Sequence, residues 1–558
     1  MNMKRKLMLI NALMAVMLTA SACSSGSTTD NKGTPPPAQQ EGDKTEGTAD
    51  VPADPFGKYD PPIEVSTVRI VNDTLKFAEG ETIDDNVWTK LYMDELGVKV
   101  KNMWVVNNTG GQGAQKMNMT IMSGDLPDFI PVDATQLKQL VDAGKVMDLT
   151  EIYEKFAAPF TKDALNANGP GVLQSATFNG KLMAIPGSVT AISEAPLLWV
   201  RTDWLKKLNL PEPKTMEDVF KISEAFTKND PDGNGKADSI GLVIHKNMMG
   251  SFAGLDGFFN GFHAYPGSWI KDASGKLVYG SIQPETREAL LKLQEMYKAG
   301  EIDREFGVKD GGKAAEMATA GKAGMYYGPL WTPIWPIQAN IDNDPNADWQ
   351  AFPIVSIDDQ PARPQIHLSI SDYYAVNKNA KNPEALLKLL NMFPEKGYGK
   401  TAEPTKYFNV DGVEKFKYAP FQLFPSVPGI ADRIDEALKT DDTSKLSPDE
   451  KSNYEMIKKY RAGDKSFWAY ERIFTKGAGL DLNDKYAEQN LAMMDEFYGA
   501  PTKTAVEKGS TLSKMEIETF TKIIMGDKIE NFDKFVEDWK RLGGDDWTNE
   551  VNEWASSK

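Results

Sequence analysis

Residues 197–215 read LLWVRTDWLKKLNLPEPKT and contain a clear transition from strand to helix. The apolar run Leu197–Val200 predicts a buried strand. Thr215 can cap a helix over Thr215–Phe226, with Asp218 three residues later as its partner in a capping box. A strand followed by a capped helix is the repeating unit of an alternating α/β fold, so this stretch sets the fold class for the chain.

The same alternation extends to both sides of this stretch. It predicts a mainly parallel, doubly wound sheet built from βαβ units in a two-lobed α/β body. The predicted strands are Val65–Val71, Val98–Val106, Asp128–Val132 and Lys181–Ile185. The predicted helices are Asn86–Leu96, Ala114–Met122, Thr135–Ala143, Pro284–Ala299, Pro383–Met392, Met515–Ile524 and most of the last thirty residues.

Composition excludes several classes of function. The chain has 558 residues, with 63 Lys and Arg against 80 Asp and Glu, and the net charge of −17 disfavours nucleic acid as a partner. One Cys and three widely spaced His exclude disulfide frameworks, zinc–thiolate sites and HExxH metalloenzymes. The sequence contains no nucleophile elbow and no P-loop. Glycoside hydrolysis needs a pair of carboxylates, but among so many acidic residues the presence of such a pair is not informative. A polysaccharide-degrading enzyme therefore stays only as an alternative, and we expect no catalysis.

The N-terminus has the pattern of a targeting segment. Lys4–Lys6 are basic, Leu7–Leu18 is apolar but too short to span a bilayer, and small residues precede Cys23. This stretch resembles a bacterial lipobox, although Ala20 stands where Leu is commoner. The resemblance implies a signal peptide over residues 1–22, lipidation of Cys23 with palmitate, and anchoring at the extracellular face of the cell membrane. The alternative is an ordinary signal peptide with an incidental Cys. Residues 23–57 are polar and predict a disordered linker.

Four phrases of the sequence resemble a known family. They are SGDLPD at 123–128, GKLMAIP at 180–186, LLWVRTDWL at 197–205 with LNLPEPKT at 208–215, and AVNKNAKNPEA at 375–385. Together they resemble the extracellular solute-binding proteins of carbohydrate ABC importers, of the maltose-binding type. The larger lipoprotein and alginate-oligosaccharide-binding branch is the more similar one. The four phrases span most of residues 60–400.

This resemblance implies a two-lobed periplasmic-binding-protein-like α/β fold of type II, with a ligand cleft between lobes joined by crossing hinge segments. Lobe 1 would comprise residues 58–188 and 354–410, and lobe 2 residues 189–353 and 411–558. The crossings would lie near Gly187–Glu194, near Ala351–Val355 and after Gly399.

The resemblance also implies a function. The chain would capture an oligosaccharide by hinge closure and deliver it to the transmembrane subunits of an ABC-type permease, acting as a monomer. A surface receptor or scaffold lipoprotein with a non-sugar ligand, such as a peptide or a sensor-kinase partner, is the alternative from a different class.

Residues 230–238, DPDGNGKAD, resemble the first nine positions of an EF-hand loop. Asp230, Asp232, Asn234 and Asp238 would supply side-chain oxygens, and Lys236 its carbonyl, to a structural calcium ion. Gly241 stands where the loop normally has a bidentate Glu, and Ser239 stands where alginate-type binding proteins have an acid. A polar turn held by Asx hydrogen bonds is the alternative.

Aromatic residues mark the predicted ligand site, because sugars stack their C–H faces on flat rings. The densest stretch is residues 324–335, in which Trp331, Trp335 and Tyr327 are the candidates; packing in the core is the alternative for each. Tyr373, Trp269 and Arg201 are further candidates, although an internal ion pair between Arg201 and Asp203 is the favoured interpretation of that pair. A uronate ligand would require a cation, and the sequence offers Arg201, Arg363 and Lys181.

Overall fold

The computed structural model describes residues 54–557, apart from 73–74, 109–110, 168, 170, 188–191, 369, 371, 411–412 and 426. The signal peptide, Cys23 and most of the linker lie outside these residues. Residues 52–558 form one compact unit. The unit begins before the expected boundary at residue 58, because Lys388 Nζ donates to the carbonyl of Gly57 (2.6 Å) and Asn391 Nδ2 to that of Pro55 (3.0 Å).

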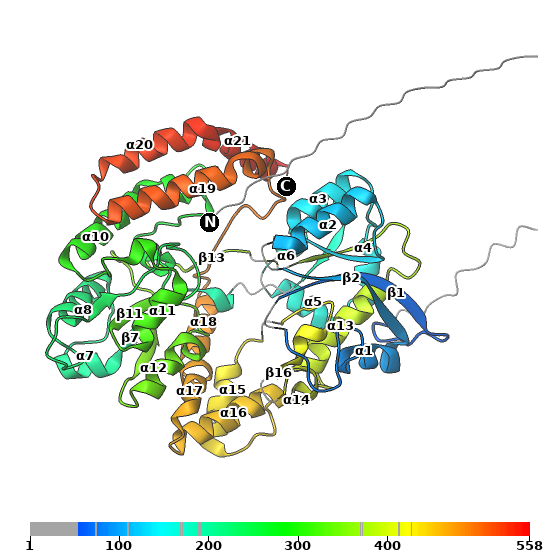
Figure 1. Ribbon diagram of the computed structural model, residues 1–558, viewed down its shortest axis with the longest axis horizontal. Coiled ribbons are helices and arrows are strands. Elements are labelled where there is room, and N and C mark those ends of the chain that lie inside the picture. The colour runs from blue at the N-terminus through cyan, green and yellow to red at the C-terminus, as the bar shows by residue number, and fades with distance from the viewer. Residues whose placement is uncertain are drawn as a thin grey trace, which may run out of the picture. The chain divides into compact units, whose positions relative to one another are not determined.

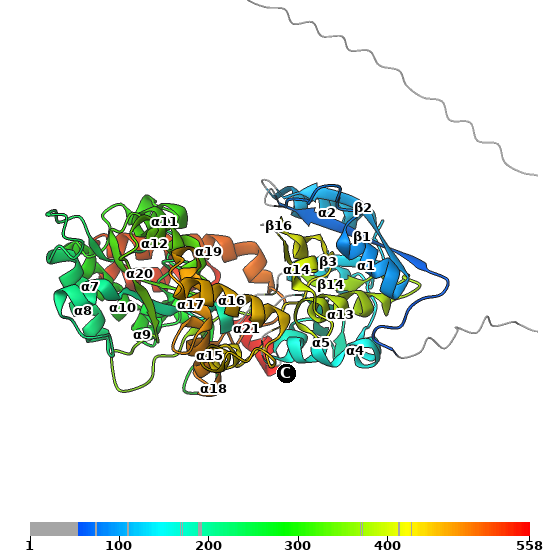
Figure 2. The same ribbon diagram turned by 90° about the horizontal axis from the view of Figure 1, so that it is seen from below.

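The first sheet has the strand order β3-β14-β6, formed by Phe129–Val132, Tyr373–Val376 and Ala184–Pro186. The parallel pair β1 (Ile63–Val71) and β2 (Val98–Asn107) packs beside it, in the register Ile63 to Val98. The threonine hydroxyl of Thr67 donates to the carbonyl of Phe129 (3.0 Å), which ties β1 to β3. Figure 2 shows α2 and α5 on opposite sides of β3 and β14.

Helices with well-defined ends surround this sheet. Asn86 and Asp133 both close capping boxes, at the starts of α1 and α3, and Gly97 ends its helix with a left-handed φ of 64°. The helices are α1 (Val87–Leu91, continued by a wider turn over Tyr92–Leu96), α2 (Gln112–Ser123), α3 (Ala134–Asp142), α4 (Thr150–Phe156), α5 (Pro159–Asn166), α6 (Gly171–Ser175), α13 (Ala385–Tyr398) and α14 (Pro404–Tyr407).

The second sheet has the order β12-β7-β11-β8, formed by Trp349–Phe352, Leu197–Arg201, Ala323–Gly328 and Ile240–Leu242. The predicted capping box is confirmed, since Thr215 Oγ1 accepts from the amide of Asp218 (3.2 Å) at the start of α8 (Met216–Lys228). The other helices around this sheet are α7 (Thr202–Leu208), α9 (Asp256–Gly261), α10 (Pro284–Ala299), α11 (Gly311–Thr319) and α12 (Gln338–Asn343). Two short strand pairs lie outside this sheet. One is formed by β9 (Trp269–Lys271) and β10 (Leu277–Tyr279), and the other by β13 (Gln365–Ile366) and β17 (Met493–Met494).

The prediction of a mainly parallel sheet is wrong. β14 runs antiparallel to both β3 and β6, and β7 runs antiparallel to both β11 and β12. Only the pairings of β1 with β2, β11 with β8 and β13 with β17 are parallel among the described strands. The reason is topological: β14 returns to the first sheet after the chain has built the second one, and it enters from the opposite end.

The C-terminal part of the chain is helical, as predicted (Figure 1). Trp539 stacks on Tyr279 with ring centroids 5.0 Å apart, and Trp547 packs at 5.6 Å against Trp269. The helices are α15 (Ile430–Thr440), α16 (Pro448–Arg461), α17 (Trp468–Phe474), α18 (Gly479–Glu488), α19 (Lys503–Ile524), α20 (Glu530–Trp539) and α21 (Asp545–Ser556). No described helix has the length and apolar character needed to cross a bilayer.

The lobe boundary expected at residue 410 has to move. Residues after 410 were expected in lobe 2, but Phe421 packs edge-on against both Phe129 and Tyr374 of the first sheet. Arg69 also donates to the carbonyls of Tyr418 (2.7 Å) and Lys417 (2.8 Å). Residues 417–421 therefore pack with the first sheet, and the last crossing follows them.

Candidate functional site

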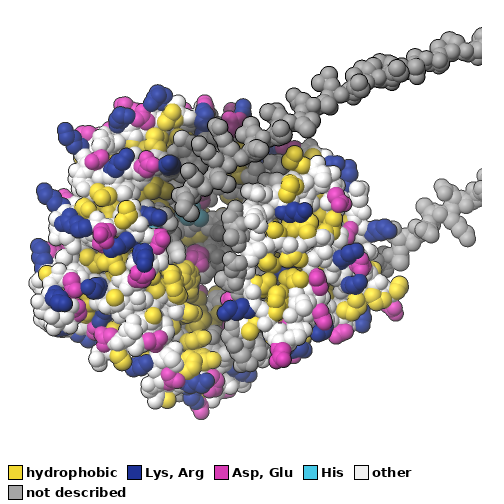
Figure 3. Space-filling model, in the orientation of Figure 1, with side chains coloured by type: hydrophobic (Ala, Val, Ile, Leu, Met, Phe, Trp, Pro, Cys, Tyr) yellow, Lys and Arg dark blue, Asp and Glu magenta, His cyan; other side chains and the backbone are white. Residues whose placement is uncertain are grey.

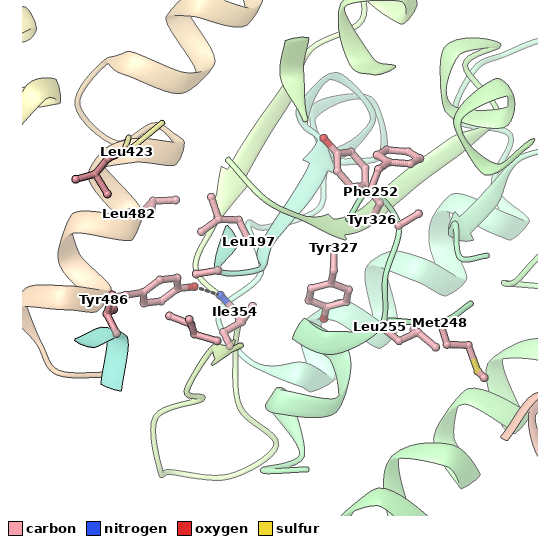
Figure 4. Close-up of a cluster of buried hydrophobic side chains, with 14 of the residues drawn as sticks. Leu197, Met248, Phe252, Leu255, Tyr326, Tyr327, Ile354, Leu423, Leu482 and Tyr486 are labelled. Carbon is pink, nitrogen blue, oxygen red and sulfur yellow. Dashed lines mark hydrogen bonds between the residues drawn. The ribbon is translucent and has the colours of Figure 1, made fainter. Parts of the chain in front are cut away.

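The predicted aromatic stretch begins on β11, a strand that is buried on both faces. Successive side chains of a strand point to opposite sides, so Tyr326 and Tyr327 diverge, as Figure 4 shows. Tyr326 packs at 4.6 Å against Phe252, and its hydroxyl donates to Thr332 Oγ1 (3.0 Å). Tyr327 packs edge-on against Phe258 at 6.4 Å, and its side chain is almost fully buried.

A cavity of about 110 Å³ lies at the end of β11, where the chain leaves the sheet. It gathers residues from distant segments: the turn before β7, the loop before α9, the end of β11, and β13. The residues that line it are Glu194, Pro196, Gly250, Ser251, Gly254, Asp256, Tyr327, Gly328, Pro329, Gln365, Ile366 and His367.

Glu194 connects this cavity to the first aromatic residue beyond β11. The indole Nε1 of Trp331 donates to both carboxylate oxygens of Glu194, at 3.0 and 3.2 Å. Burial raises the pKa of Glu194, and the hydrogen bond from Trp331 only partly opposes this effect. The pair fixes the orientation of the indole ring at the edge of the cavity.

The cavity lining holds a second carboxylate. Asp256 Oδ2 accepts from the amide of Gly250 (2.6 Å), and a side chain at Gly254 would come within 2.9 Å of the same oxygen. Gly250 has a φ of 69°, which a glycine adopts readily. The loop before α9 is thus shaped around the Asp256 carboxylate.

Gln365 and His367 complete the polar lining. Gln365 Nε2 donates to the carbonyl of Pro266 (2.6 Å) and to Ser268 Oγ (3.0 Å), which fixes the amide. His367 Nδ1 lies 3.8 Å from Asp495 Oδ2. Burial lowers the pKa of His367, but the hydrogen bond of Asp495 and the charges of Asp256 and Asp495 outweigh it and leave that pKa above its ordinary value.

Trp335 lies beyond the cavity wall and is exposed. Its side chain is 51% accessible, and that of its neighbour Ile334 is 54% accessible. Two residues four positions apart share a face only if the segment between them is helical. Trp335 has extended backbone angles (φ −146°, ψ 126°), so it does not share a helical face with Trp331. The ring touches Phe252 edge-on at 6.3 Å, which leaves one face in solvent.

The structure does not bring the other predicted ligand residues to this cavity. Trp269 is 3% exposed and packs between Tyr279 and Trp547. Tyr373 is buried on β14, opposite Val132 and Pro186. Neither ring has a free face, because each is enclosed by the core, and the geometry does not support a ligand role for either.

Arg201 is also committed to the interior of the fold. Its side chain donates through Nε (2.7 Å) and Nη2 (2.6 Å) to the two oxygens of Asp203, and its guanidinium lies 4.5 Å from the ring of Trp204. The internal ion pair favoured in the sequence is confirmed, and the ligand role considered for Arg201 is not supported.

The acidic loop at 230–238 is folded around its own side chains. Asp230 accepts from the amides of Gly233 (3.1 Å), Asn234 (3.1 Å) and Gly235 (3.0 Å). The Asn234 amide donates to Asp232 (2.6 Å) and Asp238 (3.0 Å), so it draws the carboxylates together. These are the contacts of the Asx turn that the sequence analysis kept as its alternative.

The donor set of this loop suits a hard cation. Partial burial raises the pKa of Asp232, and the neighbouring charges of Asp230 and Asp238 add to this effect. A cation would relieve the repulsion between these carboxylates. Ser239 is buried, and its hydroxyl already donates to the carbonyl of Phe226 (2.8 Å) in the interior of the fold.

A cation would have to displace existing partners. Lys322 Nζ donates to Asp238 (2.8 Å), and Lys207 Nζ to the carbonyl of Pro231 (2.8 Å). Within the described ranges, no group of three or more His, Cys, Asp or Glu side chains is placed to hold a metal ion. The oxygen ligands of this loop are therefore of the type that calcium prefers, but their side chains are not arranged around a common point.

The polar residues of the cavity were not among the predicted site residues. Glu194 lies at the end of an expected crossing segment, and His367 was considered only in excluding metalloenzymes. Asp256 and Gln365 carried no signal, because neither belongs to a motif. Only the position of Glu194 in a crossing offered a hint, since crossing segments border the cleft in the resembled family.

Comparison with known proteins identifies the family and agrees with the fold. A family model described as "Bacterial extracellular solute-binding protein" matches residues 76–398. Lipoprotein LipO of Bacillus subtilis is 25% identical over 481 residues, which cover 83% of this chain and 87% of LipO. The polygalacturonan/rhamnogalacturonan-binding protein YtcQ of the same organism is 25% identical over 453 residues, covering 78% of this chain and 82% of YtcQ.

The solved structures show the same fold. The Streptococcus pneumoniae ABC-transporter substrate-binding protein FusA, in complex with kestose, superposes with a TM-score of 0.58 at 17% identity. The match covers 89% of this chain and 99% of FusA. A second structure of FusA is described as an EF-hand mutant in complex with fructo-nystose, and it superposes with a TM-score of 0.57 at 16% identity.

Proposed function

The chain belongs to the family of bacterial extracellular solute-binding proteins, and we propose that it captures an oligosaccharide and delivers it to an ABC-type permease. The single observation that carries the proposal is the arrangement at the end of β11. There Trp331 is hydrogen-bonded to Glu194, which lines a cavity together with Asp256 and Gln365, and Trp335 follows four residues later with half of its surface exposed. Flat rings beside fixed hydrogen-bonding groups are what a sugar needs from its binding site.

Two relatives support this choice of ligand. YtcQ is named for binding pectic polysaccharides, and FusA was solved with kestose and with fructo-nystose. These names describe those proteins, and they support carbohydrate as the ligand class here. The family consists of binding proteins, and we assign this chain a binding role without catalysis.

Capture would proceed by closure of two lobes about the crossing segments. A ligand that contacts both lobes stabilises the closed form by its additional contacts there. We assign the first sheet and α13 to lobe 1 and the second sheet to lobe 2, with the last boundary moved beyond Phe421. The closed monomer would then dock on the transmembrane subunits of the permease.

The anchor and the metal belong to the same proposal. We assign residues 1–22 as a lipoprotein signal peptide and Cys23 as the lipidated residue, which places the protein at the extracellular face of the membrane. The relative LipO is named as a lipoprotein and supports this assignment. We assign structural calcium to Asp230, Asp232, Asn234, Asp238 and the carbonyl of Lys236, and the EF-hand named for FusA supports it.

The test is thermal unfolding of the compact unit, Pro52–Lys558, against a panel of oligosaccharides in calcium. An oligosaccharide at a hundred times its Kd adds about 2.7 kcal/mol to the folded state. A rise in Tm with one class of glycan, confirmed by calorimetric titration, is the expected outcome. If no oligosaccharide raises the Tm while a peptide library does, the carbohydrate assignment is refuted.

A further inference from the structure

The cavity beside β11 contains acidic groups and no basic side chain that is free. Glu194 and Asp256 both line it, and among its described lining residues there is no Lys or Arg. Both carboxyl groups are held in place, Glu194 by the indole of Trp331 and Asp256 by the amide of Gly250. Any ligand in this cavity therefore meets oxygen acceptors whose positions are fixed.

His367 is the one lining residue that can become positive, and its charge is already balanced. One ring nitrogen of His367, Nδ1, lies 3.8 Å from Asp495 Oδ2. The other ring nitrogen, Nε2, lies 2.9 Å from Gln365 Nε2. An imidazolium at this position would pair with Asp495, so it offers little net attraction to an anion from outside.

The basic residues considered for a uronate ligand are occupied elsewhere. Arg201 pairs with Asp203 in the core, at 2.6 Å. Arg363 donates to the carbonyls of Leu491 (3.3 Å) and Ala492 (2.9 Å), and it is not among the residues that line the cavity. Lys181 lies on the surface, 3.6 Å from Asp148.

These contacts have a direct consequence for selectivity. Carboxylates are strong acceptors for the hydroxyl groups of an uncharged sugar. A carboxylate on the ligand would instead be brought out of water beside like charges with no cation to pair it, and like charges disfavour each other strongly at a partly buried site. Arg and Lys are the side chains that pair strongly with a ligand carboxylate, and the described residues that line this cavity include neither.

We infer that the site selects uncharged oligosaccharides and rejects oligouronides, the fragments of pectin and alginate. The inference rests on the proposed function and narrows it. It also distinguishes this chain from YtcQ, whose name specifies polygalacturonan, an acidic polymer. Trp331 and Trp335 would stack on the sugar faces, and Glu194 and Asp256 would accept from the hydroxyls.

The test is calorimetric titration of Pro52–Lys558 at pH 7.5 with two sets of tri- to pentasaccharides. The uncharged set contains fructo-, gluco-, galacto-, manno-, xylo- and arabino-oligosaccharides. The acidic set contains oligogalacturonides and oligoalginates. We expect at least one uncharged ligand to bind, and every oligouronide to bind at least tenfold more weakly than it.

The outcomes separate this inference from the function on which it rests. An oligouronide that binds as tightly as the best uncharged ligand, or more tightly, overturns the inference and leaves the carbohydrate function standing. If no member of either set binds, both the inference and the carbohydrate function fail.

Two variants test the role of the carboxylates. Glu194→Gln and Asp256→Asn keep the size and an acceptor oxygen but remove the charge. We expect each variant to weaken the binding of the uncharged ligand about tenfold and to reduce the discrimination against oligogalacturonide. The control is Glu217→Gln on the exposed face of α8, where the carboxylate pairs with Lys221 at 3.4 Å. Equal discrimination in all three variants would contradict the assigned role.

Discussion

Glu516 is a buried carboxyl group whose protonation should control the pH dependence of stability. It lies on α19 and is 6% exposed. Ser281 Oγ donates to it at 2.8 Å and the hydroxyl of Tyr279 at 3.2 Å, and Tyr279 in turn stacks on Trp539. Burial raises the pKa of Glu516 to about 7, because two neutral donors do not replace the water that a carboxylate loses.

The sign and size of the effect follow from this pKa. Between the ordinary pKa of 4.5 and the folded value of about 7, the folded protein keeps the proton while the unfolded chain releases it. The free energy of unfolding therefore falls as pH rises through this window. At about 1.4 kcal/mol per pH unit, the gap gives a loss of about 3 kcal/mol, complete above the folded pKa.

The experiment compares wild type with Glu516→Gln in urea unfolding at pH 4.5, 5.5, 6.5, 7.5 and 8.5. Glutamine keeps the shape of the protonated acid and cannot ionise. The difference in free energy, variant minus wild type, should rise by about 3 kcal/mol across the series. Glu518→Gln, two residues further along α19 and half exposed beside Lys514, is the control and should show no such rise. A difference for Glu516→Gln that stays flat with pH would refute the reasoning.

Three further predictions concern the core ion pair, the acidic loop and the ligand site. Asp203→Ala removes the two close hydrogen bonds of the buried Arg201 guanidinium and leaves it only the distant Asp344, so urea unfolding should show a loss of about 3 kcal/mol. Asp344→Ala, 3.9 Å from the same Arg, should cost under about 1 kcal/mol. Calcium at 10 mM should raise the free energy of unfolding by about 1.4 kcal/mol if its Kd is near 1 mM. Asp232→Asn should abolish the corresponding rise in Tm. The control Asp272→Asn, which changes an ordinary Asx turn, should keep that rise. Trp331→Ala should weaken the best oligosaccharide at least tenfold in calorimetry, and Ile517→Ala on the exposed face of α19 should not.

Local signals in the sequence predicted local structure well. The capping pair Thr215 and Asp218 fixed the start of α8, and the bounds Pro284–Ala299 of α10 agree with the structure. Both depend on interactions within a few residues, which the sequence displays directly. The helix predicted to end at Met392 continues to Tyr398, past Pro394, because packing in the core overrides the local preference of proline.

Strand direction and the polar lining could not be predicted in this way. β14 pairs with β3 across more than two hundred residues, and no local pattern records the direction from which it returns. Glu194 and Trp331 are separated by 137 positions, and Gln365 and Asn260 by 105. Such contacts depend on the path of the crossing segments, so the residues that determine selectivity were invisible until the fold was known.

The division of the aromatic residues between core and ligand site has a simple cause. Tyr326 and Tyr327 lie on β11, which has neighbouring strands on both edges and is covered on both faces, so their rings are buried whichever way they point. Trp331 and Trp335 follow the carboxyl end of that strand, where Trp331 is half-buried beside Glu194 and Trp335 is 51% exposed. In open α/β sheets, ligands bind outside the carboxyl ends of strands. Aromatic residues within a central strand therefore serve the core, and those a few residues beyond its end are available to a ligand.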